Sequence, residues 1–245
     1  FAAEAGVFAA QLAAAGISGP SQAVEGKYGF YTLYGEGDVA TLTRDLGAHY
    51  ESLATAIKKY PSCTANHVPI DLLIDLAVTN DLTPDDIERV KIELSPFANG
   101  LVGDAFDPSD NPQVAAQFSI HYSAASALLR RRLGIAEIQN DAVHDSAIAE
   151  FIPKVEITID DGNGGKFAPA RVTVKTTGGA TLDGYLENVP GTPANPLSDN
   201  QVAAKFRDCA QFGLQPRSAA EADALAATLG QLENRDSLTG ILERS

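Results

Sequence analysis

The chain has 245 residues, of which 44% are hydrophobic and 20% charged, and its formal net charge is −14. This composition is typical of an ordinary globular protein with enough residues for a sizeable core. The negative charge argues against nucleic-acid binding, because that function needs a basic face that displaces counterions. No apolar run approaches the roughly 18 residues of a membrane-spanning helix, and no signal-peptide pattern is present, so we expect a cytoplasmic protein.

The two cysteines, Cys63 and Cys209, lie in unrelated contexts without the spacing of a metal site. In a chain of this size, such a pair favours an intracellular protein with reduced thiols. We therefore predict that the two are not bonded to each other. The chain begins with Phe1 and contains no methionine, so we interpret it as part of a longer protein.

The first 57 residues predict a helix followed by an irregular connector. Residues 1–15 form an Ala-rich helical pattern that Gly16 ends. Residues 16–38 are rich in glycine and favour a connector with one short helix. Residues 50–58 are expected to form a strand or an extended segment.

The stretch 58–76 places nucleophilic and titratable side chains directly before an apolar run. Thr64 can cap a helix whose first turn accepts Pro69, because the first N–H groups of a helix have no partner within it. Those N–H groups would face Ser62 and Cys63, where they favour a carboxylate or a phosphate.

His67 is the candidate acid or base of this stretch. If the helix includes His67, Asp71 lies on the same face four residues later, where its carboxylate can fix which ring nitrogen carries the proton. Such a pair is also common on helix surfaces, where it stabilises by about a few tenths of a kcal/mol. Lys58 is equally compatible with a solvated lysine, and Cys63 with a small buried hydrophobe. The spacing leaves both interpretations open.

Beyond this stretch, helical patterns alternate with strands of period two. Gly178 and Gly179 favour a hairpin between the last two strands. A basic cluster, residues 130–132, is expected to end a helix before a left-handed cap at Gly134. The expected elements are a helical turn at 83–86, a strand at 89–94, a long loop at 95–111, helices at 113–133 and 141–151, strands at 155–160, 170–176 and 181–186, helices at 198–212 and 218–233, and a partly helical tail to Ser245.

Tyr122 lies on a stripe of small residues in the expected helix 113–133. A core tyrosine with a satisfied hydroxyl and a functional tyrosine both fit this position.

Consecutive strands beside helices predict an α+β fold with an antiparallel sheet faced by helices. We expect an α+β module at 58–190. The flanking helical segments, 1–57 and 191–245, would belong together.

Four blocks of the sequence resemble motifs of the MmgE/PrpD family, which includes 2-methylcitrate dehydratase, cis-aconitate decarboxylase and iminodisuccinate epimerase. They occur in the family's order along nearly the whole chain. The blocks are Gly16-Ile17-Ser18-Gly19-Pro20 with Glu25-Gly26 and Gly29-Phe30, then Lys58-x-Tyr60-Pro61-x-Cys63-x-x-x-His67 with Ile70-Asp71, then Gln117-Phe118-Ser119-Ile120-His121-Tyr122 with Ala127-Leu128, and last Asn195-Pro196-Leu197-Ser198 with Lys205-Phe206.

The resemblance implies an enzyme that acts on a small di- or tricarboxylate without a metal or an organic cofactor, as a dehydratase-type lyase or an epimerase. It also implies that 58–190 is a small α+β lid domain and that 1–57 and 191–245 belong to a larger all-α domain. A homodimer is implied as well, and so is a large helical N-terminal half that lies outside this sequence. The fragment alone is expected to be inactive, because other catalytic residues of the family lie in that half. In the decarboxylase branch a His stands five residues after the motif lysine, and the Cys63 found here disfavours decarboxylation.

The resemblance also assigns roles to individual residues. Lys58 would anchor a substrate carboxylate, and the Tyr122 hydroxyl would donate to the substrate. The acid/base would be His67 steadied by Asp71, and an anion pocket would be completed by Ser62 and the N–H groups near Cys63. We predict that Lys58, His67 and Tyr122 converge on one cleft. The alternative is a non-catalytic lid or dimerisation fragment that binds a partner chain through its first helix and its C-terminal helices.

Overall fold

The computed structural model describes residues 1–35, 37–235 and 237, and the chain divides into two compact units, Phe1–Leu53 and Ala54–Ser245. The expected division into 1–57, 58–190 and 191–245 stays a prediction. The helical tail expected near Ser245 falls almost entirely outside the described residues. Among the described helices, none combines the length and the apolar composition that crossing a membrane requires.

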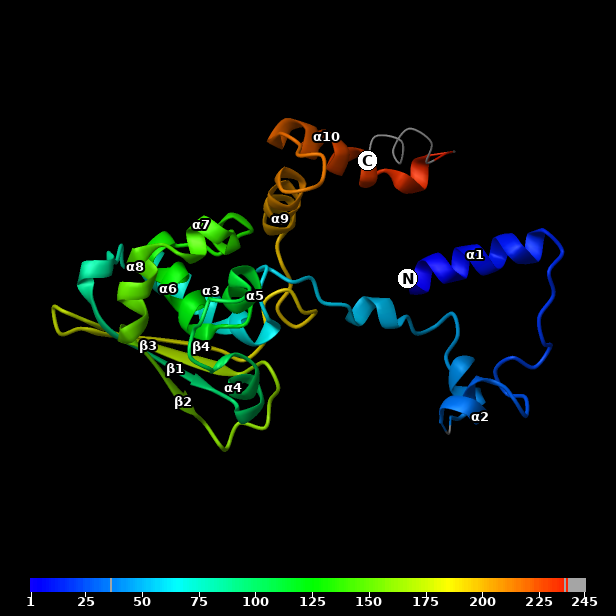
Figure 1. Ribbon diagram of the computed structural model, residues 1–245, viewed down its shortest axis with the longest axis horizontal. Helices are drawn as coiled ribbons and strands as arrows, with labels where there is room; N and C mark the ends of the chain where they lie inside the picture. Colours follow the sequence, from blue (N-terminus) through cyan, green and yellow to red (C-terminus); the bar gives the residue numbers. More distant parts are fainter. Residues whose placement is uncertain (36, 236, 238–245) are drawn as a thin grey trace. The chain divides into compact units, whose positions relative to one another are not determined.

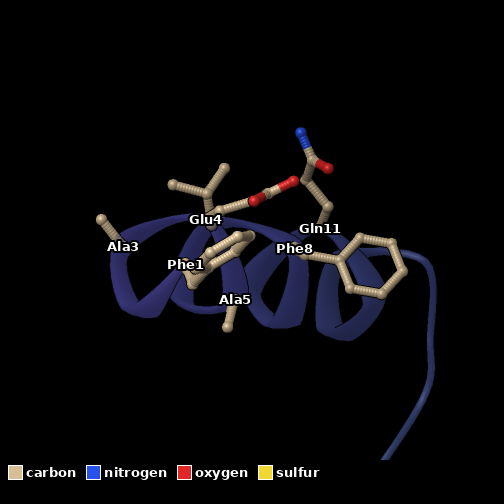
Figure 2. Close-up of a pocket in the computed structure, with 7 residues that line it drawn as sticks. Phe1, Ala3, Glu4, Ala5, Phe8 and Gln11 are labelled. Atoms are coloured by element: carbon tan, nitrogen blue, oxygen red, sulfur yellow. The ribbon is translucent and has the colours of Figure 1, made fainter. Parts of the chain in front are cut away.

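The first unit consists of short helical segments joined by irregular chain. Helix α1 spans Ala2–Ala14 and α2 spans Phe30–Tyr34, as predicted, and neither buries a residue. Apolar side chains such as Phe1 and Phe8 project from α1 into solvent (Figure 2). For residues 50–58 the prediction of a strand is wrong, because the first part of this segment forms a 3-10 turn, Glu51–Ala54. A second 3-10 turn spans Val39–Leu42.

The second unit combines a four-stranded sheet with helices, which confirms the α+β class. The helical turn predicted at 83–86 and the helices predicted at 198–212 and 218–233 are all present. The strands are β1 (Ile87–Leu94), β2 (Val155–Ile159), β3 (Ala170–Thr176) and β4 (Thr181–Leu186). The helices are α3 (His67–Thr79), α4 (Pro96–Val102), α5 (Pro112–Gln117), α6 (Ile120–Arg130), α7 (Asn140–Val143), α8 (Ser146–Phe151), α9 (Asp199–Gln211) and α10 (Ala219–Leu229), with 3-10 turns at Thr64–Asn66, Pro84–Asp86, Ala136–Ile138, Ile152–Lys154 and Leu232–Asn234.

The sheet is mixed, with the strand order β2-β1-β3-β4, so the expectation of a wholly antiparallel sheet is wrong. Strands β1 and β2 run parallel, with Val90 opposite Val155. The chain between them passes through α4 to α8, and such a crossover returns it to the end of the sheet from which β1 started. Strands β3 and β4 form the predicted antiparallel hairpin, whose turn contains Gly179 at φ +85°.

One face of the sheet is buried and the other is charged. Helices α3 and α6 cover the buried face, with α3 packed on β3 and β4 and α6 on β2 (Figure 1). Ile92 points into this core, while its neighbours in β1, Lys91 and Glu93, point to the opposite face. There Arg89 pairs with Glu156 and Lys175 with Glu88, each at 2.7 Å. An antiparallel-rich sheet commonly has one solvated face of this kind.

The expected loop at 95–111 contains α4, and the expected helices at 113–133 and 141–151 are each divided in two. In each case a side-chain oxygen accepts a hydrogen bond from a backbone N–H two or three residues later, which starts a new helix. Arg131, rather than Gly134, provides the left-handed residue after α6, at φ +52°. The capping residues are Ser95 for α4, Ser119 for α6 and Asp145 for α8.

Candidate active site

Helix α3 begins at His67, directly after the 3-10 turn Thr64–Asn66. The prediction that Thr64 caps this helix is wrong, because Thr64 lies within the preceding turn. Asn66 occupies the cap position without a capping hydrogen bond. Its buried amide nitrogen instead donates to Ser62 Oγ at 2.9 Å and to the Gln117 carbonyl at 3.3 Å. The start of α3 is thus tied to the loop before it.

The carbonyl oxygen of Gln117, at the end of α5, holds this loop in place. It accepts a hydrogen bond from the Ser62 hydroxyl at 2.8 Å and another from the Cys63 N–H at 2.9 Å. These donors are the groups expected to form an anion pocket. In this structure a protein carbonyl already binds these two donors. Substrate contacts at Ser62 and Cys63 therefore stay a prediction.

Lys58 and His67 meet at a second carbonyl oxygen, that of Ser62. The Lys58 Nζ atom donates to it at 3.1 Å, and His67 Nε2 lies 3.4 Å from it. A ring nitrogen that faces a carbonyl carries the proton, so Nδ1 is the nitrogen with the free lone pair. That Nδ1 is buried and has no hydrogen-bond partner in the described part of the chain. The structure thus brings the predicted anchor and the predicted base together.

His67 is fully buried, and burial lowers its pKa to about 4. The hydrogen bond to the Ser62 carbonyl opposes this shift, while the positive charges of Lys58 and Lys205 add to it. At neutral pH the ring is therefore uncharged, which is the form that accepts a proton. The influence of Lys205 places α9 near this site.

Asp71 does not hydrogen-bond to His67, so the predicted pair is wrong. Its Oδ1 atom accepts a hydrogen bond from the Tyr60 hydroxyl at 2.5 Å and forms an ion pair with Lys59. Burial and the neighbouring carboxylate raise the pKa of Tyr60 above its usual range. The Tyr60 ring packs edge-on against the His67 ring, with 5.4 Å between centroids. Neither Lys59 nor Tyr60 is among the predicted site residues, although Tyr60 is a position of the motif and Lys59 directly precedes it.

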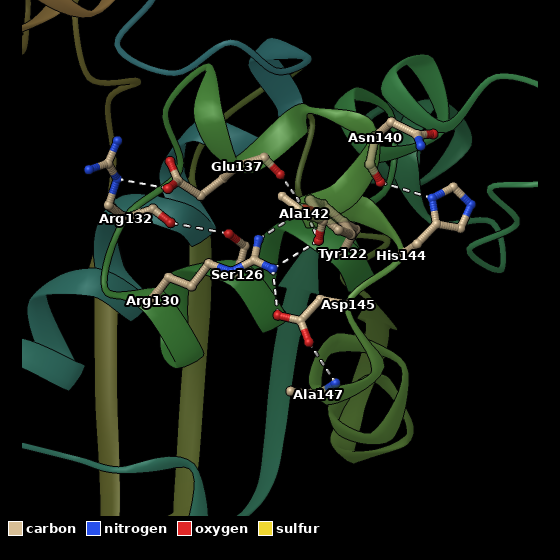
Figure 3. Close-up of polar contacts among 10 residues, drawn as sticks. All are labelled: Tyr122, Ser126, Arg130, Arg132, Glu137, Asn140, Ala142, His144, Asp145 and Ala147. Carbon is tan, nitrogen blue, oxygen red and sulfur yellow. Dashed lines mark hydrogen bonds and ion pairs between the residues drawn. The ribbon is translucent and has the colours of Figure 1, made fainter.

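Tyr122 is fully buried, and its hydroxyl is already engaged by three neighbours (Figure 3). The hydroxyl contacts the carbonyl oxygens of Glu137 and Ala142, the latter at 3.3 Å, and accepts a hydrogen bond from Arg130 Nη1 at 3.2 Å. Arg130 also forms an ion pair with Asp145 at 2.9 Å. Burial raises the pKa of Tyr122, and the hydrogen bond from Arg130 acts against that rise.

The predicted convergence of Tyr122 with Lys58 and His67 on one cleft stays a prediction. Within the described residues, its hydroxyl shares no hydrogen-bonding partner with Lys58 or His67. The cap at Ser119 starts α6 so that the Tyr122 ring packs in the core against Phe106, with 5.2 Å between centroids. A catalytic role for Tyr122 stays a prediction, since a substrate would have to displace these partners.

Within residues 1–35, 37–235 and 237, no three His, Cys, Asp or Glu side chains lie close enough together to hold one metal ion. Cys63 and Cys209 are both free thiols, which confirms that they do not bond to each other.

The sequence profile of the MmgE/PrpD C-terminal domain matches residues 60–231, which is most of the chain. The chain belongs to the MmgE/PrpD family. The match confirms the suspected family and identifies the chain with its C-terminal part. The first motif block and Lys58 lie outside the matched residues. MmgE/PrpD proteins are generally enzymes of the dehydratase or epimerase type. No curated protein matches the sequence. The matched segment includes His67 and its neighbours, α5, α6 and α9.

Proposed function

We propose that this chain is the C-terminal part of an enzyme that acts on a small di- or tricarboxylate by abstracting a proton next to a carboxylate. The reaction is that of a dehydratase-type lyase or an epimerase. The observation that carries the proposal is the meeting of Lys58 Nζ and His67 Nε2 at the Ser62 carbonyl, at 3.1 and 3.4 Å. Family membership supplies the reaction class.

In this scheme the Lys58 ammonium binds a substrate carboxylate through a charge-assisted hydrogen bond. The neutral His67 ring takes the proton from the adjacent carbon, and nearby cations stabilise the negative charge that develops. In a dehydratase, an acid then protonates the departing hydroxyl. In an epimerase, the proton returns to the opposite face of the carbon. Neither version of the scheme uses a metal or an organic cofactor.

Access to His67 requires a movement of the loop. The free lone pair of His67 lies on Nδ1, which is buried. The loop at 58–63 contacts the other ring nitrogen, Nε2, through the Ser62 carbonyl, and Ser62 and Cys63 bind it to Gln117. A substrate that takes over those hydrogen bonds would open the loop, and the N-terminal half of the enzyme would supply the remaining catalytic groups. We further propose a cytoplasmic homodimer, by resemblance to the family.

Turnover of the complete natural protein tests the proposal. Each candidate substrate (2-methylcitrate, iminodisuccinate and cis-aconitate) is incubated with the enzyme, and products are identified by NMR. We expect His67→Gln to lower kcat by about 10²–10⁴, and Lys58→Ala to raise KM as well as lower kcat. Lys91→Ala, on the charged face of the sheet, is the control and should behave as wild type. A wild-type kcat in the His67 variant would contradict the proposal.

A non-catalytic lid or dimerisation fragment is the second candidate, and the exposed face of α1 supports it. Phe1, Val7 and Phe8 are all exposed and line an apolar hollow along this helix (Figure 2). A single helix of 13 residues is marginal in water, so a partner chain packed on this face would stabilise α1.

Association of the 245-residue chain tests this second function. Sedimentation equilibrium should show self-association that the double substitution Val7→Ser and Phe8→Ser abolishes. The same substitution at Tyr185, an exposed aromatic residue of β4, is the control. A chain that stays monomeric at all concentrations measured would contradict dimerisation through α1.

A further inference from the structure

A groove of about 240 Å³ lies between the motif segment, the turn after α6 and one face of α9. Four of its lining residues are basic and one, Asp208, is acidic, whereas the whole chain has 18 basic and 32 acidic residues. A concentration of positive charge in an acidic protein indicates a local function. The basic residues are Lys59, Arg131, Arg132 and Lys205.

Helix α9 forms one wall of the groove with a single face. Gln201, Ala204, Lys205 and Asp208 follow the spacing i, i+3, i+4, i+7, which aligns side chains along one side of a helix. Asp208 Oδ2 accepts a hydrogen bond from the Ile135 N–H at 3.0 Å, which anchors this face beside the turn after α6. The groove is therefore formed by elements that are held together.

Of the four basic side chains in the groove, that of Lys205 has no counterion within the described part of the chain. Its ammonium group makes no hydrogen bond and no ion pair there, although the side chain is half-buried. Arg131 binds Asp81 through Nη2 at 2.7 Å, and Arg132 binds Glu137 through Nε at 2.9 Å. Each guanidinium has further N–H groups that can donate to a ligand, because arginine carries five donors.

The acidic partners of these arginines do not line the groove, and Asp208 is engaged by a backbone N–H. We propose that the groove binds a small multivalent oxyanion, with Lys205 as its central contact and Arg131 and Arg132 as fork-shaped donors. Charge-assisted bonds from arginine to carboxylate or phosphate oxygens are among the stronger polar contacts in proteins. The volume falls below the roughly 300 Å³ at which pockets for drug-sized ligands begin, so the ligand has few atoms.

This groove adjoins the Lys58–His67 pair, but neither Lys58 nor His67 lines it. Tyr60 lies between them, because it lines the groove and its ring contacts the His67 ring edge-on. The proposed anion binding therefore depends on the residues that line the groove and not on the proposed reaction.

Isothermal titration calorimetry of the 245-residue chain with citrate, and separately with inorganic phosphate, tests the inference. We expect the anion to bind and its affinity to weaken with added salt. We also expect Lys205→Ala and Arg132→Ala each to reduce this affinity at least tenfold. Lys175→Ala removes a lysine of the sheet that pairs with Glu88 and should leave binding unchanged. Circular dichroism confirms that each variant is folded. Stronger binding of citrate assigns the site to polycarboxylates, and stronger binding of phosphate assigns it to phosphorylated ligands.

His67→Gln separates this inference from the proposed function. The groove predicts that this variant keeps its affinity for the anion, whatever happens to turnover. If neither anion binds the wild-type chain, or if Lys205→Ala and Arg132→Ala both bind as wild type, the inference is overturned. Loss of binding in the His67 variant alone would move the anion to the Lys58–His67 pair and would likewise overturn it.

Discussion

A histidine that is buried in its neutral form makes a protein less stable in acid, and His67 is such a residue. Its pKa in the folded protein is about 4, against 6.5 when exposed. Between these values the unfolded chain binds the additional proton, so stability falls as the pH drops from 6.5 to 4. The shift corresponds to about 3 kcal/mol from this residue.

Urea denaturation between pH 7 and pH 4 measures this effect, with pH 7 as the neutral reference. We expect the unfolding free energy of the wild type to fall more steeply than that of His67→Gln, because glutamine does not titrate. The comparison uses the slopes, so a constant difference in stability between the two proteins does not matter. Equal slopes would contradict a buried, neutral His67.

The carboxylate of Asp71 gives a second prediction at this scale. Asp71→Ala leaves the buried Tyr60 hydroxyl without its acceptor and Lys59 without its ion-pair partner. An unsatisfied buried polar group costs about 1–3 kcal/mol, so we expect a loss in that range by urea denaturation. Asp75→Ala changes an exposed residue of the same helix and should stay within about 0.5 kcal/mol of wild type.

A double-mutant cycle measures how strongly Asp71 interacts with Tyr60. Asp71→Ala combined with Tyr60→Phe should cost less than the sum of the single changes, because the two residues share one hydrogen bond. Strict additivity would show that the Tyr60–Asp71 bond contributes nothing to stability.

At the scale of elements, the core position of Tyr122 on α6 predicts that its hydroxyl contributes to the stability of the fold. Tyr122→Phe leaves Arg130 Nη1 and the Glu137 carbonyl without this partner, so we expect a loss of about 1–3 kcal/mol in chemical denaturation. Tyr185→Phe removes an exposed hydroxyl from β4 and should be neutral. A large loss of kcat without loss of stability in Tyr122→Phe would instead support the substrate contact implied by the family.

The sheet shows which properties of elements can be predicted locally. Alternation of apolar and polar residues predicted all four strands, because a strand with one buried face has period two wherever it lies. Pairing follows from the path of the chain between strands. Residues 95–111 were expected to be a loop, so α4 was overlooked, and with it part of the crossover that makes β1 and β2 parallel.

At the scale of the whole molecule, the core lies in the second unit. The buried hydrophobic side chains run from Tyr60 to Ala222, and none of the described ones belongs to Phe1–Leu53. We therefore expect residues 54–245 expressed alone to unfold cooperatively with a Tm within about 2–4 °C of the full chain, a shift that corresponds to about 1 kcal/mol.

Thermal unfolding followed by circular dichroism measures this difference. The complementary peptide 1–53 is the control and should show no cooperative transition, because it lacks a core of its own. A shift well beyond that range, or loss of cooperativity on truncation, would show that the first unit contributes to the stability of the second.

The sequence alone determined the α+β class, the strand positions, the β3–β4 hairpin and membership of the MmgE/PrpD family. These follow from alternation, turn residues and ordered motifs, all of which are local properties. It also selected Lys58 and His67, which meet at one carbonyl. Only the tertiary structure decided that Asp71 binds Tyr60 and that Gln117 occupies the donors of the expected anion pocket. Those contacts join residues far apart in the sequence, and their proximity depends on how α3, α5 and the loop between 58 and 66 pack together.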